Sequence, residues 1–238
     1  MAKSARTAEA KLDQWRDRLE AVGQEHLLAF WNGLANNDQQ ELLADLACLN
    51  LAELPGLSKL AVGGGTNYGP TGRLEAVQVI QAASAGREVA DRGRALLSGG
   101  KVAAFTVAGG QGTRLGFDGP KGAFRISPVR NKPLFQLFAE FIIATGRRYG
   151  CRPPWYIMTS PANDQPTRAY FQEHSHFGMN PADVIFFQQG VVPAFDQAGK
   201  ILLDRRHRLS LAPDGHGGSL LALARAGMLD DMRRRGVE

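Results

Sequence analysis

The sequence predicts an α/β protein in which a mostly parallel sheet follows an N-terminal helical region. From Lys101 onward, short apolar runs alternate with amphipathic stretches, which is the pattern of strands joined by helices. Before Ser98, apolar residues recur mainly at helical spacing. We therefore divide the chain into a helical region, 1–98, and a sheet domain, 99–238. The composition, 44% hydrophobic and 21% charged over 238 residues, is ordinary for a globular protein.

Helical spacing begins early in the N-terminal region. Leu12, Trp15 and Leu19 recur three and four residues apart, and "HLLAFWNGL" continues the pattern. Trp15 and Trp31 are therefore expected in the core. "NNDQQELLADL" predicts a further helix whose first turn Asn37 can cap while Gln40 reaches back. A glycine-rich stretch, 62–72, follows no strand and has no lysine after its glycines. We interpret it as a connection and not as a phosphate loop.

The remaining elements follow in order. A helix from about Gly86 to Leu97 stops at Gly99-Gly100, where glycine can adopt the left-handed cap. Beyond it we expect strands and helices in alternation: strand 102–107, helix 133–150, strand 155–160, helix 167–174, strand 184–189, a further strand 201–204 and a closing helix 218–236.

Charge and cysteine content exclude several classes of protein. The net charge of +5 suits an anionic ligand but is too mild to indicate nucleic acid, and the dense run Arg233 to Arg235 reads as a solvated helix end. Cys48 and Cys151 form neither a disulfide framework nor a metal-binding spacing, which fits a reducing cytoplasm. The N-terminus has no apolar signal core, and no run approaches the roughly 18 apolar residues of a membrane span.

The stretch "FTVAGGQGTRLGFDGPKGAF", 105–124, is the strongest functional signal. In a parallel sheet, ligands bind outside the carboxyl ends of the strands, and here Gly109 and Gly110 follow a strand directly. Glycine lets the backbone approach a ligand closely, and successive N–H groups favour anionic oxygens. Arg114 adds a planar fork and Lys121 a point charge. Together these residues predict a phosphate-binding loop.

The spacing rejects two familiar phosphate loops. A Walker A loop needs glycine-lysine followed by Ser or Thr, whereas Lys121 comes nine residues after Gly112. A dinucleotide fingerprint needs G-x-G-x-x-G, but after Gly110 and Gly112 the third glycine falls one position late, at Gly116. The acidic residue expected about 20 positions further on is also missing.

At these residues the sequence resembles the eukaryotic-type UDP-sugar pyrophosphorylases, and within them the UDP-N-acetylglucosamine branch. "EHLLAFWNGL", "GKVAAFTVAGGQGTRLG", "GPKGAF", "WYIMTS", "VVPAFDQAGKILLD" and "LAPDGHGGSLLAL" are similar to successive family blocks and span most of 24–238. The resemblance implies a Rossmann-like nucleotidyltransferase core that joins a sugar 1-phosphate to UTP, with Mg²⁺, and releases pyrophosphate. It implies no protein nucleophile, because the sugar phosphate oxygen attacks the α-phosphorus directly.

The resemblance also implies roles for single residues. Arg114 would hold the β- and γ-phosphates, and Lys121 would neutralise charge near the α-phosphate. Gln189 would read the uracil edge, and the backbone of Gly215 would contact the base. The turn that would surround the nucleotide consists of Ala108, Gly109, Gly110, Gln111, Gly112 and Thr113.

The sugar remains open at this stage. The N-acetylglucosamine branch usually has asparagine where this chain has His216, and "GHG" is similar to the UDP-glucose and broad UDP-sugar branches. His216 is therefore a candidate substrate-binding residue. Three functions follow: a uridylyltransferase for N-acetylglucosamine 1-phosphate, one for glucose or galactose 1-phosphate, and a catalytically silent module that binds uridine nucleotides.

The metal ligand is expected elsewhere. By the resemblance, the 238 residues correspond to about the first half of a family member, and the metal-binding aspartate follows them. None of Asp204, Asp214, Asp230 and Asp231 matches it. We therefore expect UTP binding with little or no turnover by these residues alone.

Overall fold

The computed structural model describes residues 12–63, 75–79, 81, 86–215 and 217–238. Most of the predicted connection 62–72, and the candidate residue His216, lie outside the described residues. The chain divides into two compact units, 1–76 with 191–212, and 77–190 with 213–238. This division differs from the boundary expected near Ser98, because residues 77–98 belong to the second unit and residues 191–212 return to the first.

The first unit is built on helices. Residues 12–20 are helical, and the elements that follow are η1 (Glu25–Leu28), η2 (Trp31–Gly33), α2 (Asn36–Ala47) and α3 (Leu54–Val62). Leu19, Leu42 and Leu46 are fully buried in their shared core, and Trp31 lies in it as predicted. The predicted helix cap is wrong. α2 begins at Asn36 without a side-chain cap, and the Asn37 amide donates instead to Glu41 one turn on.

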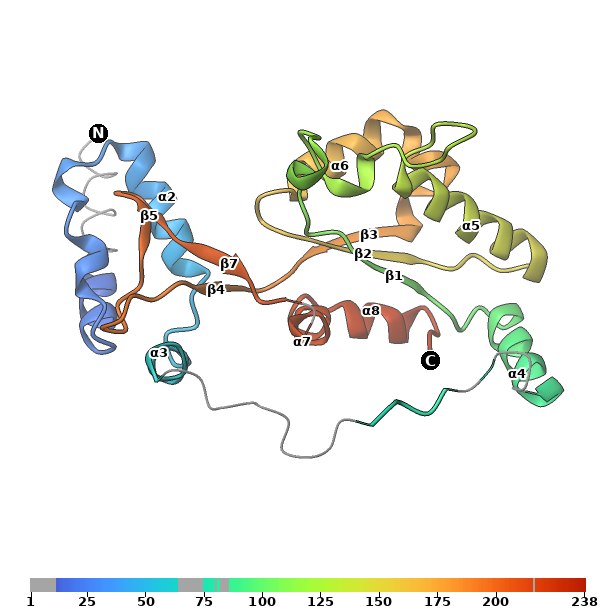
Figure 1. The fold of residues 1–238 in the computed structure, drawn as a ribbon, viewed down its shortest axis with the longest axis horizontal. Coiled ribbons are helices and arrows are strands. Elements are labelled where there is room, and N and C mark those ends of the chain that lie inside the picture. Colours follow the sequence, from blue (N-terminus) through green and yellow to red (C-terminus); the bar gives the residue numbers. More distant parts are fainter. Residues whose placement is uncertain (1–11, 64–74, 80, 82–85, 216) are drawn as a thin grey trace. The chain divides into compact units, whose positions relative to one another are not determined.

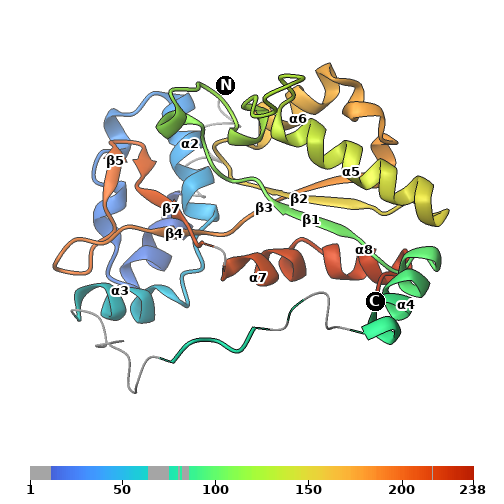
Figure 2. The ribbon, with the colours of Figure 1, turned by 45° about the vertical axis from the view of Figure 1, so that its right-hand side comes forward.

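Residues 191–212 belong to this unit because they complete its core. They form β4 (Val191–Pro193), paired with β7 (Leu211–Pro213), and an antiparallel pair, β5 (Leu203–Arg205) with β6 (Arg208–Leu209). Ile201 and Leu209 are buried among the helical leucines. The side chain of Gln24 donates to Gly199 O (2.9 Å) and accepts from Ile201 N (2.8 Å). Figure 2 shows β5 beside α2. The predicted strand 201–204 thus lies outside the parallel sheet.

The second unit contains the predicted parallel sheet. Its strands are β1 (Ala104–Val107), β2 (Trp155–Thr159) and β3 (Val184–Gln188), in the order β1-β2-β3 (Figure 1). Both pairings are parallel: Thr106 is in register with Ile157, and Ile157 with Phe186. Because parallel strands share one direction, their carboxyl ends lie at one edge of the sheet. The α/β fold class is confirmed.

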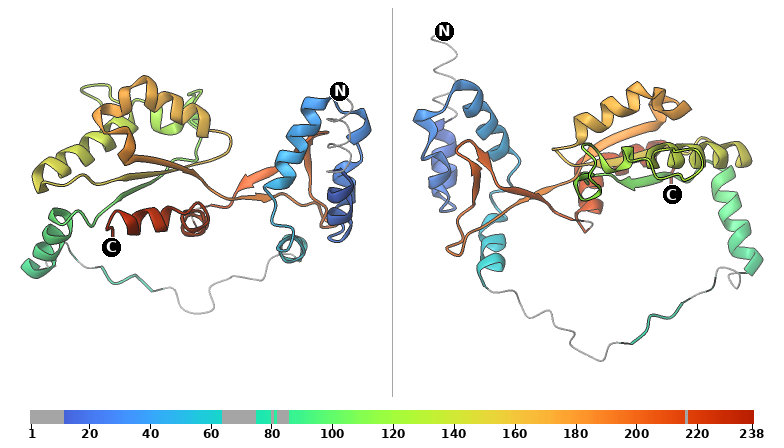
Figure 3. Two further views of the ribbon diagram at one scale, coloured as in Figure 1. Left: turned by 180° about the vertical axis from the view of Figure 1, so that it is seen from behind. Right: turned by 45° about the horizontal axis from the view of Figure 1, so that its top comes forward.

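Helices cover both faces of this sheet (Figures 1 and 3). α5 (Leu134–Tyr149) and α6 (Asp164–Glu173) lie on one face, and α7 (Gly218–Arg225) and α8 (Met228–Arg234) on the other. Since side chains alternate along a strand, Trp155 and Ile157 of the middle strand pack under α5 and α6, while Tyr156 and Met158 pack against α7. Burial on both sides explains why β2 is apolar nearly throughout.

The remaining elements of this unit are short, apart from one helix. They are α4 (Gly86–Ser98), close to its predicted bounds, and four 3₁₀ turns: η4 (Thr113–Leu115), η5 (Lys121–Ala123), η6 (Ser175–Gly178) and η7 (Pro181–Asp183). The closing helix predicted over 218–236 is broken into α7 and α8. None of the described helices is both long enough and apolar enough to cross a membrane.

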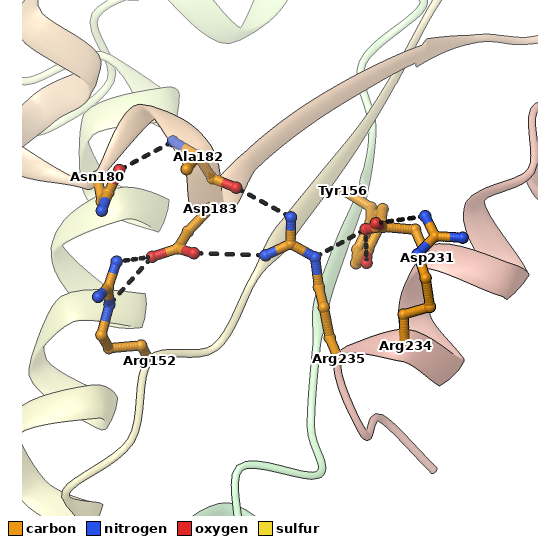
Figure 4. Close-up of polar contacts among 8 residues, drawn as sticks. All are labelled: Arg152, Tyr156, Asn180, Ala182, Asp183, Asp231, Arg234 and Arg235. Carbon is orange, nitrogen blue, oxygen red and sulfur yellow. Dashed lines mark hydrogen bonds and ion pairs between the residues drawn. The ribbon is translucent and has the colours of Figure 1, made fainter.

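A polar network ties the end of α8 to the sheet (Figure 4). The hydroxyl of buried Tyr156 donates to Asp231 (2.7 Å), which also accepts from Nε of Arg235 (2.7 Å). Arg235 further donates to Ala182 O (3.1 Å) and reaches Asp183 (3.4 Å), the partner of Arg152. All three arginines of the predicted solvated run are exposed, although Arg235 also pairs with Asp231 and Asp183.

The network predicts a loss of stability in acid. The hydrogen bond from Tyr156, helped by Arg235, holds the pKa of Asp231 below its ordinary value. A carboxylate with a lowered folded-state pKa stabilises the protein above its unfolded-state pKa, about 3.9, and this contribution disappears as the pH falls through the folded-state pKa. Asp231→Asn should therefore lower the free energy of unfolding by about 1 kcal/mol at pH 7 and by less at pH 3.

Urea unfolding at several pH values between 7 and 3 measures this difference. Asp230→Asn is the matched control, because Asp230 is 68% exposed and pairs with the exposed Arg233 on its own helix. The control should leave the pH dependence of wild type intact. A parallel pH dependence for Asp231→Asn and wild type would contradict the assignment.

Candidate functional site

A cavity of about 350 Å³ opens at the carboxyl ends of the strands. Its lining brings together five of the residues predicted from the sequence: Gly109, Gly110, Lys121, Gln189 and Gly215. Val107, at the end of β1, and Pro213 complete it. This is the edge of a parallel sheet at which ligands are expected.

The glycine-rich loop folds back on itself to place Lys121 in this cavity. An isolated antiparallel bridge pairs Gln111 with Pro120. Within it, Lys121 N donates to Gly110 O (3.1 Å) and Gly112 N donates to Gly119 O (2.9 Å). The residues between Gly112 and Lys121, whose number excludes a Walker A loop, therefore form a closed loop that brings the lysine back beside the glycines.

The loop leaves donors free on its inner side. Among the described residues, the N–H groups of Gly109, Gly110 and Gln111 make no hydrogen bond to the backbone. Nor does any described carboxylate pair with the Lys121 ammonium, which is exposed. Unpaired amides beside an unpaired cation form a site for an anionic ligand such as a phosphate.

Gln189 lies against the backbone of this loop. A Cβ added at Gly109 would come within 2.8 Å of the Gln189 side-chain nitrogen, so only glycine admits the amide at this place. The backbone of Gln189 is fixed by its N–H, which donates to Thr159 O (2.8 Å). Gln189 is 8% exposed, and its side-chain amide has no hydrogen-bonding partner in the described part of the chain. A side-chain amide carries both a donor and an acceptor, so it can pair with the edge of a planar base.

Gly122, which follows Lys121, is a second position at which a side chain would not fit. A Cβ added at Gly122 would lie 2.2–2.5 Å from the ring of Phe135, a residue of α5 that is 1% exposed. Since Phe135 itself packs on Phe171 (5.0 Å between ring centroids), it has no room to move. The turn that carries Lys121 thus rests directly on the core.

Five predicted residues do not line the cavity. Arg114 lies on η4, exposed and without a described partner, and Gln111 and Thr113 are exposed as well. Ala108 packs on the core at the end of β1, and Gly112 is buried behind Phe117. The roles predicted for these residues remain predictions.

The sequence interpretation overlooked the turn after β2. Ser160, Asn163 and Asp164 are all buried, and Asn163 contacts the glycine-rich loop. The polar residues directly after the middle strand could have indicated this turn in the sequence. A middle strand ends between the loops of both its neighbours, so residues that follow it lie near a site at that edge.

The described residues contain no cluster of side chains that would hold a metal ion by itself. No group of three or more His, Cys, Asp and Glu side chains among them lies close enough to hold a metal ion. The carboxylate of Asp214 packs against the Cα positions of Gly190 and Gly218 and does not line the cavity. Asp230 and Asp231 are paired with arginines of α8 and its end.

Comparison with known proteins identifies the family of this chain. Residues 73–238, which include the whole cavity, match the model of the family described as UTP–glucose-1-phosphate uridylyltransferase. The chain belongs to this family. The resemblance seen in the sequence is thereby confirmed, and the free donors, the lysine and the buried amide are features of a uridylyltransferase-family chain.

Named members of the family are similar over almost the whole chain. The UDP-N-acetylhexosamine pyrophosphorylase-like protein 1 of Homo sapiens is 40% identical over 241 residues, 94% of this chain and 48% of its own length. The UDP-N-acetylglucosamine pyrophosphorylase of Saccharomyces cerevisiae is 35% identical, over 91% of this chain and 49% of its own. The chain therefore spans about half the length of these relatives.

A solved structure shows the same fold. The uridine diphosphate N-acetylglucosamine pyrophosphorylase of Trypanosoma brucei, in complex with an inhibitor, superposes with a TM-score of 0.75 at 27% identity. The match covers 94% of this chain and 49% of that structure. The Rossmann-like core expected from the sequence is thus that of the pyrophosphorylases.

Proposed function

We propose that this chain binds UTP in the cavity at the ends of β1 and β3, as part of a uridylyltransferase that makes UDP-N-acetylglucosamine. The observation that carries the proposal is the joint placement of Gly109, Gly110, Lys121 and Gln189 around one cavity. The loop amides and the lysine suit the phosphates, and the buried side-chain amide of Gln189 suits the uracil edge. The names of the relatives support N-acetylglucosamine 1-phosphate as the second substrate.

The chemistry requires charge stabilisation and not a protein nucleophile. An oxygen of the sugar 1-phosphate attacks the α-phosphorus of UTP, the bond to the β-phosphate breaks, and pyrophosphate leaves. Lys121 would neutralise charge near the α-phosphate, and Arg114 would hold the leaving phosphates. Catalysis by such groups comes from positioning and electrostatics. We assign Mg²⁺ to the reaction on family grounds, without a residue of this chain, and place the protein in the cytoplasm, where its free cysteines suit reducing conditions.

Pyrophosphate release with a panel of sugar 1-phosphates tests the sugar. Because these 238 residues alone are expected to show little or no turnover, the panel is assayed with a protein that contains them and spans the full length of the relatives. N-acetylglucosamine 1-phosphate is expected to be used in preference. Turnover with glucose or galactose 1-phosphate alone would instead support the alternative that His216 suggests. Tight UTP binding without turnover of any sugar would support a catalytically silent binding module.

Replacing Gln189 tests the nucleotide. Wild type is expected to bind UTP more tightly than ATP, and Gln189→Ala to reduce this preference by about tenfold, because the base loses a hydrogen-bonding partner. Isothermal titration with both nucleotides measures the ratio. Gln136→Ala, which removes a half-buried amide that donates to Glu140 on α5, is the matched control and should retain the preference. A variant at position 189 that still discriminates would contradict the assignment.

A further inference from the structure

We infer that Asn163 is a positioning residue for the phosphate-binding loop. We further infer that the turn after β2 holds this loop and Gln189 in their places around the cavity. This inference rests on the proposed function, because it concerns the geometry of the same cavity. It adds residues, Asn163 and Asp164, that make no contact with the ligand but decide where the ligand-binding groups lie.

Asn163 uses all of its side chain inside the protein. It is fully buried, and its amide nitrogen donates to Ala108 O (2.8 Å) and Gly110 O (3.3 Å). Its side-chain oxygen accepts from the backbone N–H and the hydroxyl of Ser160, each at 2.9 Å. A buried side chain with this many bonds has one orientation. Removing it would leave Ala108 O without a partner among the described residues, while Gly110 O would keep only its bond from Lys121 N (3.1 Å).

These bonds orient the glycines. Gly109 and Gly110 lack the side chains that restrict backbone torsion, so the loop alone has many conformations. Asn163 holds the carbonyl groups on either side of Gly109, those of Ala108 and Gly110. With these carbonyls turned toward the protein, the unpaired N–H groups of the loop remain available to a ligand.

The next residue of the turn extends the same framework to Gln189. Asp164 accepts from Thr159 Oγ1 (2.5 Å) and from Arg168 Nε (2.8 Å), and the Gln188 side chain bonds to it as well. Burial would raise the pKa of Asp164, but these donors outweigh it and the pKa is lowered. The carboxylate is thus ionised and held. Gln188 directly precedes Gln189, so the turn after β2, together with Asp164 at the start of α6, contacts the chain segments on both sides of the cavity.

Nucleotide titration distinguishes positioning from simple destabilisation. Asn163→Ala is expected to weaken UTP and ATP binding alike, by about tenfold, so that the preference for UTP survives. Uridine, which has no phosphates, should lose less than about twofold. Gln189→Ala should show the opposite pattern, with the preference lost. Urea unfolding of each variant, measured in parallel, reports whether the fold is intact.

Two further variants keep the test decisive. Asn163→Asp has the same shape and retains an acceptor for Ser160, but offers no amide hydrogens to the loop, so it should lose phosphate affinity as Asn163→Ala does. Asn180→Ala removes an exposed asparagine that caps η7, far from the cavity in sequence, and should bind as wild type.

The outcomes separate the inference from the proposed function. If wild type fails to prefer UTP over ATP, the proposed function is wrong. If wild type binds UTP and both Asn163 variants, folded, bind it with unchanged affinity, the function stands and the positioning role is wrong. An equal loss for UTP and uridine would also overturn the role, since the defect would then not lie at the phosphates.

Discussion

Lys121→Met is expected to weaken UTP binding by about 10- to 100-fold, the largest effect on binding of any single substitution in the cavity. Of the described residues that line the cavity, Lys121 is the one that carries a charge. A hydrogen bond to a charged group contributes about 1.5–3 kcal/mol, which corresponds to that range of affinity. Methionine keeps the length and apolar volume of the side chain, so packing on the turn should survive.

Titration at low and high salt sharpens this test. Wild-type affinity should fall as salt rises, because the ammonium and the triphosphate attract each other through screened charge, whereas the affinity of Lys121→Met should respond less. Lys132→Met is the matched control. It removes a lysine from the same region, but one already paired with Glu140 (2.6 Å). Equal affinities for Lys121→Met and wild type would remove the lysine from the site.

Trp155→Ala is expected to lower the free energy of unfolding of the sheet-containing unit by about 3–5 kcal/mol. Trp155 is fully buried on the middle strand and packs edge-on against Phe138 (6.4 Å) and close to Phe171 (5.4 Å). Its indole N–H donates to Thr106 Oγ1 on β1 (2.9 Å). Since a domain of this size is stable by about 5–15 kcal/mol, the substitution removes a large fraction of the total.

Urea unfolding followed by circular dichroism measures the loss. If Trp155→Ala does not fold, Trp155→Phe provides the same test at smaller scale, with an expected loss of about 1–2 kcal/mol from the missing volume and hydrogen bond. Val129→Ala, at a position that is 90% exposed, should leave the unfolding midpoint unchanged. A Trp155→Ala protein as stable as this control would contradict the packing.

Local sequence determined the elements that depend on local chemistry. A continuous apolar run such as "WYIMT" is typical of a strand in a sheet that has helices on both faces. The strand that it predicts is β2, which is buried throughout. Likewise, glycines directly after a strand indicate close approach of backbone to a ligand, and Gly109 and Gly110 do line the cavity. The parallel direction of the strands and the family therefore followed from pattern and motif.

Only the tertiary structure decided which distant residues share a cavity or a core. The bridge between Gln111 and Pro120, which the sequence spacing did not predict, brings Lys121 next to the glycines. Arg114 does not line the cavity. Residues 191–212 belong to the unit of the N-terminal helices, although they lie far from these helices in the sequence, because Ile201 and Leu209 bury their apolar surface in that core. Asn163 looks like an ordinary polar turn residue in the sequence. Its importance arises from hydrogen bonds to residues more than 50 positions away, and such bonds exist only once the strands have paired.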